Sequence, residues 1–176
     1  MSILYKISII LIFLNLISCA KKEEKITVIE EKSLEMQMID AYNEGLEELE
    51  KNDVIYAAKK FNEAELLFPQ SSWAPKAALM AAYVYYAQDY YFDAEFELKR
   101  FIKTYPKHPD LNYAHFLLAM CFYEKIIDEK KDLGPLLQAQ EKFNFIVQNY
   151  PDSDYALDST YKLDLIQDYL AAKEMY

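Results

Sequence analysis

The 176-residue sequence predicts an all-α protein built of stacked antiparallel helix pairs. One helical signature, Ala-x3-[Phe/Leu]-x2-[Ala/Phe/Ile]-x4-Pro, occurs three times in the chain. The copies are Ala57, Phe61, Ala64 and Pro69; Ala94, Leu98, Phe101 and Pro106; and Ala139, Phe143, Ile146 and Pro151. The prolines lie 37 and then 45 residues apart, near the roughly 34-residue period of a tetratricopeptide repeat. Such repeats bury their apolar faces against one another, so we expect a tetratricopeptide-repeat α-solenoid of about three and a half repeats.

The composition also favours helices. Only two glycines, Gly45 and Gly134, occur in the whole chain, whereas sheets with tight hairpins use glycine in their turns. Tyrosine, in contrast, occurs 16 times. Its amphipathic ring suits both the seams between helices and the wet grooves that hold peptides.

Residues 1–18 are expected to form a signal peptide rather than part of the fold. Lys6 precedes an apolar run that ends at Ile17, and this run is shorter than the about 20 residues of a membrane span. A charged region followed by a short apolar region is typical of a secretory signal.

The next residues, Leu16, Ile17, Ser18 and Cys19, resemble the bacterial lipobox. We therefore expect diacylglyceryl and N-acyl groups on Cys19, which together would anchor the chain in a membrane. The alternative is an ordinary secretory signal with an incidental cysteine. Ala20 follows Cys19 where an aspartate would be a retention signal, so sorting to the outer membrane is expected.

The chain carries a formal charge of −10. So acidic a protein is a poor partner for nucleic acid or for anionic lipid headgroups. Contact with the membrane is therefore expected through the lipid. Cys121 lies in an apolar stretch, and we expect it to be packed in the core.

Three segments are predicted: the signal, a charged tether over 19–32, and a repeat domain over 33–176. Within the domain we predict helices at 34–51, 53–67, 73–88, 90–104, 110–127, 136–149 and 153–174. Phe68, Tyr105 and Tyr150 each precede a proline, which disfavours the α conformation and ends a helix.

Five polar residues are predicted N-caps for the helices that follow them. They are Asp53, Ser72, Asp89, Asp110 and Asp152. The longer third period places about eight extra residues in 127–135, as a loop before the sixth helix. The sequence leaves open whether this loop has a function or is a tolerated surface insertion.

Catalytic patterns are missing from the sequence, so we expect no enzyme. His108 lies in a turn and His115 on a helix, and neither is paired with a cysteine or a carboxylate cluster in sequence. Metal-ligand spacings and a glycine-rich phosphate loop are also missing, so no cofactor is expected besides the lipid on Cys19.

The first helix of each pair should line the concave surface of the array. A candidate peptide groove there comprises Tyr42 and Leu46; Leu79, Tyr83 and Tyr86; and Tyr113 and Tyr123. Aromatic rings of this kind suit an extended or helical apolar peptide. The alternative is that these side chains pack between helices.

Together, the lipobox, the tether and the helix ends Phe-Pro-x-Ser, Tyr-Pro-x-His-Pro and Tyr-Pro-x-Ser resemble the BamD family of β-barrel assembly lipoproteins. The stretch from Ala82 to Tyr113 is similar to the family's second repeat, and 168–174 to the segment that opens its fourth. The family's fold is five tetratricopeptide repeats, and the present chain ends at Tyr176, midway through the fourth. The resemblance therefore implies a truncated form.

The resemblance also implies partners: the POTRA domains of a BamA-type barrel protein, other lipoproteins of the assembly machine, and the C-termini of unfolded outer-membrane proteins. The expected location is the periplasmic face of the outer membrane. An Arg-Asp-Gln motif of the family's third-repeat insertion appears here as Lys131-Asp132-Leu133, so Lys131 and Asp132 are candidate partner contacts. The alternative function is a periplasmic adaptor for peptidoglycan enzymes or cell-division proteins.

Overall fold

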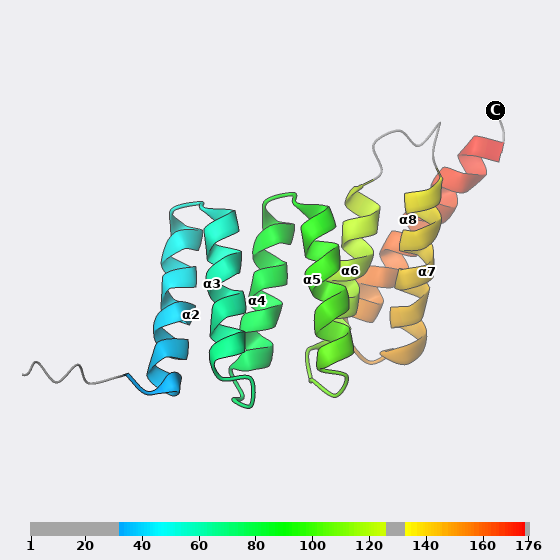
Figure 1. The fold of residues 1–176 in the computed structure, drawn as a ribbon. Helices are drawn as coiled ribbons and strands as arrows, with labels where there is room; N and C mark the ends of the chain where they lie inside the picture. The colour runs from blue at the N-terminus through cyan, green and yellow to red at the C-terminus, as the bar shows by residue number, and fades with distance from the viewer. Residues whose placement is uncertain (1–31, 126–132, 175–176) are drawn as a thin grey trace, which may run out of the picture. The chain divides into compact units, whose positions relative to one another are not determined.

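The computed structural model describes residues 32–125 and 133–174, which form seven helices and no strand in these ranges. In chain order the helices are α2 (Leu34–Glu50), α3 (Val54–Leu67), α4 (Ala74–Ala87), α5 (Tyr91–Thr104), α6 (Leu111–Glu124), α7 (Gly134–Asn149) and α8 (Asp154–Glu174). Lys32–Tyr176 makes up one compact unit. Within it, the helices stand side by side in alternating directions, as Figure 1 shows.

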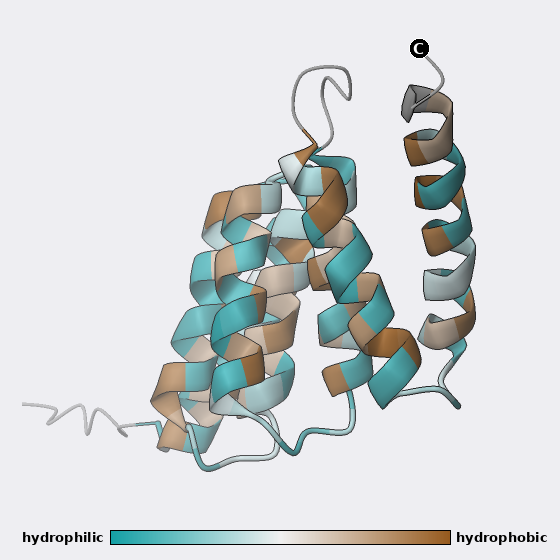
Figure 2. Cartoon of the chain, turned by 90° about the vertical axis from the view of Figure 1, so that its right-hand side faces the viewer, coloured by the Kyte–Doolittle hydropathy of each residue, from teal (hydrophilic) through white to brown (hydrophobic). Residues whose placement is uncertain are grey.

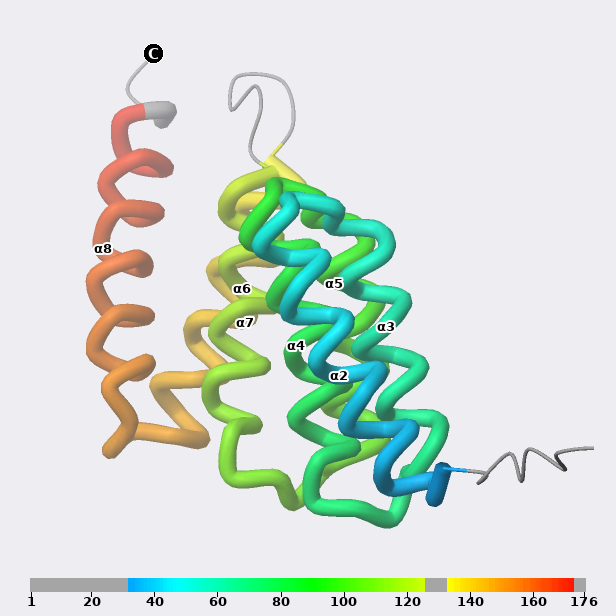
Figure 3. Tube along the Cα trace, turned by 90° about the vertical axis from the view of Figure 1, so that its left-hand side faces the viewer, coloured from blue at the N-terminus to red at the C-terminus, as the bar shows by residue number. Residues whose placement is uncertain are grey.

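The packing is that of consecutive helix pairs. Each helix from α2 to α8 contacts the next one along the chain, and in addition α4 contacts α6, and α6 contacts α8. The first helices of the second, third and fourth pairs are therefore neighbours of one another, while α3 and α5 lie on the other side of the array (Figure 3). This arrangement confirms the predicted all-α, tetratricopeptide-like solenoid.

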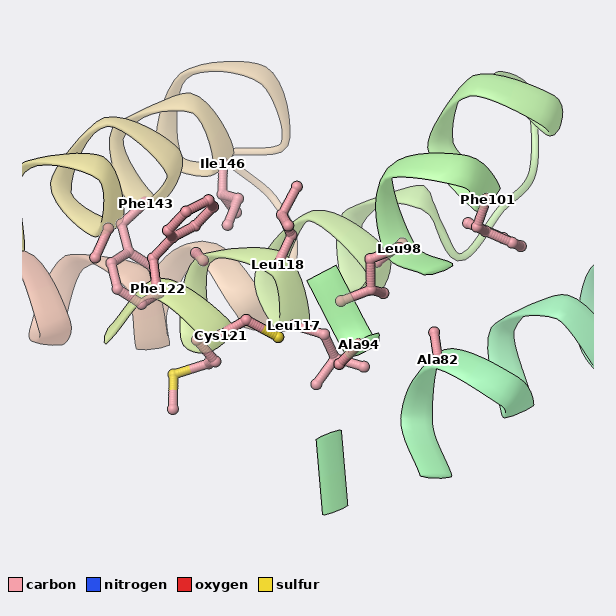
Figure 4. Packing of buried hydrophobic residues seen from close by; sticks show 14 of the residues in the cluster. Ala82, Ala94, Leu98, Phe101, Leu117, Leu118, Cys121, Phe122, Phe143 and Ile146 are labelled. Atoms are coloured by element: carbon pink, nitrogen blue, oxygen red, sulfur yellow. The ribbon is translucent and has the colours of Figure 1, made fainter. Parts of the chain in front are cut away.

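The threefold signature marks the core. Apart from its prolines, every residue of the signature is 0% exposed. Helical spacing places the alanine and the bulky residue four positions later on one face, so that each second helix buries the same stripe. The largest cluster of buried residues runs from Ala78 in α4 to Ile166 in α8, and Figure 4 shows a part of it that includes Ala82 and Ile146. The first copy of the signature lies in two smaller clusters. Cys121 belongs to the largest cluster and is 0% exposed, which confirms the expected core position.

Gly45 allows α2 to approach α3 closely. A Cβ atom at this position would lie 2.9 Å from Cε1 of Phe61, whose ring is fully buried. The glycine is in the middle of a helix, where it lowers helix stability relative to alanine by roughly 0.5–1 kcal/mol. The close contact with the Phe61 ring explains why this costly residue is placed there.

Two of the predicted N-caps are replaced by a serine. Ser71, rather than Ser72, accepts a hydrogen bond from the backbone N–H of Ala74 at 3.1 Å. Ser153, rather than Asp152, accepts one from Ala156 at 3.2 Å. Each serine lies two residues after a proline, and its backbone N–H closes a turn onto the residue before that proline. This turn brings the serine hydroxyl to the start of the helix.

Of the remaining predicted caps, only Asp53 is confirmed, because its carboxylate accepts the N–H of Tyr56 at 3.1 Å. Asp110 is at the N-cap position, but its side chain makes no capping bond. Asp89 has a φ of 64° and accepts the O–H of Tyr91 instead of capping α5. Asn52 shares this left-handed φ of 64°, which asparagine and aspartate tolerate better than most residues.

The boundaries around the third pair differ from the predicted ones. The fifth helix was expected to reach 127, but α6 ends at Glu124. The sixth was expected to start at 136, but α7 starts at Gly134, with Pro135 in its first turn. Proline suits this position because the first helical N–H groups have no acceptor within the helix. Lys131 and Asp132 lie outside the described residues.

The last helix, α8, packs on α7 and α6 through one face only. Its opposite face exposes Leu157 and Tyr161, and Figure 2 shows apolar and polar residues alternating along this helix. Among the described residues, no helix combines the length and the apolar character required to cross a bilayer.

Candidate binding surface

Aromatic residues of three first helices form one continuous patch, which we call the tyrosine surface. It comprises Tyr83 and Tyr86 of α4, Tyr113 and Phe116 of α6, and Tyr155 of α8. The ring of Tyr155 lies 5.4 Å from that of Tyr113 and 5.3 Å from that of Phe116. These separations are typical of aromatic pairs that stabilise each other. The contact therefore fixes α8 against α6 on this side of the array.

The α4 side of the surface is held by packing against the following helix. The ring of Tyr86 lies 5.9 Å from that of Tyr91, the first residue of α5. Tyr83 is three residues earlier, on the same side of α4, and keeps 38% of its surface exposed. Tyr86 is thus half-buried and fixed, whereas Tyr83 is available to a ligand.

The hydroxyl groups of Tyr86, Tyr113 and Tyr155 stay protonated far above neutral pH. Burial, with smaller contributions from the nearby Tyr83, Tyr155 and Tyr86, raises the pKa of Tyr113 to about 12. Burial is also the main reason why the pKa of Tyr86 rises to about 12. Burial likewise raises the pKa of Tyr155. Protonated phenols can donate hydrogen bonds, so the surface combines apolar ring area with donors for a carboxylate.

The predicted groove is only partly assembled. Tyr83, Tyr86 and Tyr113 meet on the tyrosine surface, but Tyr42 lies in α2 and packs elsewhere. Its ring makes edge contacts with Phe61 at 5.1 Å and Trp73 at 5.5 Å, between the first pair and α4. Leu46, also on α2, is 38% exposed.

Two further predicted residues lie away from the tyrosine surface. Leu79 is buried in the core cluster, so its side chain does not line the candidate groove. Tyr123 lies near the C-terminal end of α6, and its ring contacts that of Phe143. The ammonium group of Lys162 lies 4.2 Å from the centre of the Tyr123 ring. Tyr123 therefore fastens the middle of α8 to α6. The periodic pattern correctly placed both residues on first helices but did not indicate their burial.

One member of the surface was missed in the sequence. Tyr155 belongs to α8, which the sequence suggested only as the start of an incomplete repeat. We expected the first helix of each pair to line the concave surface. Applied to the helix predicted at 153–174, this expectation would have identified Tyr155, because Tyr155 follows the same Tyr-Pro helix end. Phe116 also packs between helices, since its ring lies 6.1 Å from that of Phe143 in α7.

The remaining residues considered for a chemical role are those of the lipobox, the possible metal ligands and the histidines. Leu16, Ile17, Ser18 and Cys19 lie outside the described residues. Within residues 32–125 and 133–174, no three His, Cys, Asp or Glu side chains gather as a group that could hold a metal ion. His108 packs against Phe101.

These features define a class of protein: a tetratricopeptide-like array of helical hairpins that presents an aromatic, hydroxyl-bearing surface for binding. The chain belongs to the YfiO family of outer membrane lipoproteins, whose sequence pattern matches residues 34–176. This membership confirms the resemblance inferred from the helix ends and places the chain at the outer membrane.

Several curated relatives carry the name outer membrane protein assembly factor BamD. The protein of Caulobacter vibrioides is 34% identical over 96% of this chain and 54% of its own length. That of Rickettsia prowazekii is 34% identical over 76% of this chain and 53% of its own. That of Neisseria gonorrhoeae is 30% identical over 76% of this chain and 54% of its own. The chain thus spans about half the length of the curated relatives it matches.

Proposed function

We propose that this chain is part of a lipid-anchored, non-enzymatic scaffold for assembling β-barrel proteins in the outer membrane. In this role it binds the periplasmic POTRA domains of a BamA-type barrel protein and receives the C-termini of unfolded outer-membrane proteins. Its family and the name of its relatives support the assembly role. The tyrosine surface supports the binding of unfolded chains.

The tyrosine surface is the observation that carries this proposal. A chain terminus offers a carboxylate next to its last side chain. The protonated hydroxyl of Tyr113 is a donor for that carboxylate, and the exposed ring of Tyr83 is a contact for an aromatic last residue. Recognition needs no catalytic group, because the ligand is held and passed on unchanged.

The test of this site uses a peptide that ends in a free carboxylate after phenylalanine. We expect Tyr83→Ala to weaken binding by about 1–3 kcal/mol, the range of an aromatic hot spot. Tyr56→Ala is the matched control, since Tyr56 is 40% exposed but lies on α3, a second helix. Equal affinities of both variants for the peptide would exclude the tyrosine surface as the binding site.

The assembly role is tested separately by purification from detergent extracts of cells. We expect the native protein to bring a BamA-type barrel protein with it. Recovery of peptidoglycan enzymes or division proteins in its place would overturn the assembly role and identify an envelope adaptor.

The lipid anchor is tested by Cys19→Ser. This change removes the thiol that would carry the diacylglyceryl group, so we expect the protein to move from the membrane fraction to the soluble periplasmic fraction. A variant that stays with the membrane would show that something other than a lipid on Cys19 holds it.

A further inference from the structure

A basic hollow lies on the second-helix side of the array, between α5, α6 and α7. Its volume is about 290 Å³, and its lining includes Lys99, Lys103 and Lys142 around His115 and Phe145. Ile102 and Leu118 add apolar surface. Three lysines against the single carboxylate of Glu141 give this hollow a positive charge, in a protein whose formal charge is −10.

The ammonium groups of the three lysines are only partly neutralised. Lys142 pairs with Glu141 at 3.0 Å, and Lys99 pairs with Glu95, which also binds Lys125. Lys103 has no ion pair with any of the residues that the structure describes. At least one full positive charge at the rim is therefore available to a ligand.

His115 lies in the hollow with its ring 4.6 Å from that of Phe145. Burial lowers its pKa, and the charge of Lys142 lowers it further. The imidazole is therefore neutral at neutral pH. It is also an internal reporter, because an anion bound between it and the lysines would favour its protonated form and raise its pKa.

The contact between α3 and α5, which we call the first junction, contains carboxylates that the contact between α5 and α7, the second junction, lacks. Four positions join α3 to α5, namely Asn62, Glu65, Glu97 and Arg100, and they form a closed network of hydrogen bonds and ion pairs. The signature alanines place Lys99, Ile102, Lys142 and Phe145 at the equivalent positions of the next junction. The first junction contains two carboxylates at these positions, and the second contains none.

We propose that this hollow binds an acidic side chain, adjacent to an apolar one, from a protein partner in the periplasm. The partner's carboxylate lies between Lys103 and Lys142 and supplies the negative charge that Glu65 and Glu97 supply at the first junction. Its apolar neighbour lies on Phe145 and Ile102. The presence of this apolar surface favours a peptide over a phosphate group, which would gain nothing from it. The site is on the opposite side of the array from the tyrosine surface and does not depend on the function proposed for that surface.

The experiment titrates the full chain in detergent micelles with the blocked peptide acetyl-ELDF-amide, followed by NMR of the two histidines. We expect the peptide to bind and to raise the pKa of His115, while His108, which packs against Phe101 instead, stays unchanged. The uncharged peptide acetyl-QLNF-amide should leave both histidines unchanged. Binding should weaken at high salt, because exposed charges are screened.

A double variant, Lys103→Gln with Lys142→Gln, should lower the affinity for the acidic peptide by at least about tenfold, since two charged contacts are lost. The matched control is Lys107→Gln with Lys51→Gln, which removes the same charge from outside the hollow and should bind as the native protein does. Equal affinity of the two double variants would overturn the proposal, as would a peptide that leaves His115 unchanged. Inorganic phosphate that raised the pKa of His115 as far as the peptide does would also overturn it, in favour of a general anion site.

Discussion

The guanidinium of Arg100 in α5 lies 2.7 Å from the carboxylate of Glu65 in α3, and so connects two successive repeats. The same guanidinium donates to Glu97 at 2.8 Å and to the side-chain oxygen of Asn62 at 2.9 Å. The hydroxyl of Tyr105 donates to Glu65 at 2.6 Å. Both carboxylates are buried, and each has partners from more than one residue. Arg100 is the single arginine of the chain, which otherwise uses lysine.

Removing this arginine should destabilise the fold. Arg100→Met leaves two buried carboxylates without their cation, a change that typically costs about 3–5 kcal/mol. Because the Arg100 side chain is about a third exposed, we expect the lower end of this range. Urea unfolding followed by circular dichroism measures the effect. Lys51→Met, which breaks an exposed pair at the C-terminal end of α2, should change stability by no more than about 0.5 kcal/mol.

An alanine at Gly45 should also destabilise the protein, although alanine favours helices. The gain of roughly 0.5–1 kcal/mol in helix propensity is opposed by overpacking against the Phe61 ring, which costs about 1–3 kcal/mol. We expect a net loss of about 1 kcal/mol, seen as a lower melting temperature. Asn43→Ala, at an exposed position of the same helix, should be neutral or slightly stabilising. A Gly45→Ala protein that melts above the native one would contradict the close approach of α2 and α3.

The ion pairs of Glu95 should make stability depend on pH. Burial alone would raise the pKa of Glu95, but hydrogen bonds from Lys125 and Lys99 outweigh it and lower the pKa below its ordinary value of 4.5. A carboxyl group with a lowered pKa stabilises the folded state above its unfolded pKa, and this contribution disappears as the pH falls through the folded pKa.

We therefore expect Glu95→Gln to lower stability by about 1 kcal/mol at pH 7 and by less at pH 3. Urea titrations at the two pH values measure the difference. Glu50→Gln, at an exposed position in the last turn of α2, is the control and should cost little at either pH. An equal loss at both pH values for Glu95→Gln would show that these ion pairs do not contribute.

The thiol of Cys121 should be unreactive in the folded protein. Its side chain is fully buried, and burial raises its pKa to about 12, so the reactive thiolate is rare at neutral pH. In a Cys19→Ser protein, Cys121 is the only thiol. We expect a colorimetric thiol reagent to label it slowly in buffer and quickly in urea. Fast labelling without urea would mean that α6 opens readily.

The sequence predicted the core well, because the burial of Ala57, Phe61, Ala94 and Leu98 follows directly from helical periodicity. It predicted caps less well. Whether Ser71 or Ser72 caps a helix depends on how the turn after the proline closes. The two serines are adjacent and identical in type, so the local composition does not distinguish them. Tertiary packing decided these positions.

Networks between repeats could not be predicted from the sequence. Arg100 and Glu65 are 35 residues apart and belong to helices rich in other charged residues, so each resembles an ordinary surface charge. Their pairing depends on the rotation of α3 relative to α5. For the same reason, the lysines around His115 became recognisable as a cluster only when α5 and α7 were seen on either side of α6.

The unequal junctions have a mechanical consequence. At the first, directional bonds centred on Arg100 resist rotation of α5 about α3. At the second, the equivalent positions carry Lys99 and Lys142, each of which pairs with a glutamate of its own helix, so among the described residues these two lysines make no directional bond from α5 to α7. We expect the first two repeats to move as one rigid body, with the bending of the array concentrated between α5 and α7.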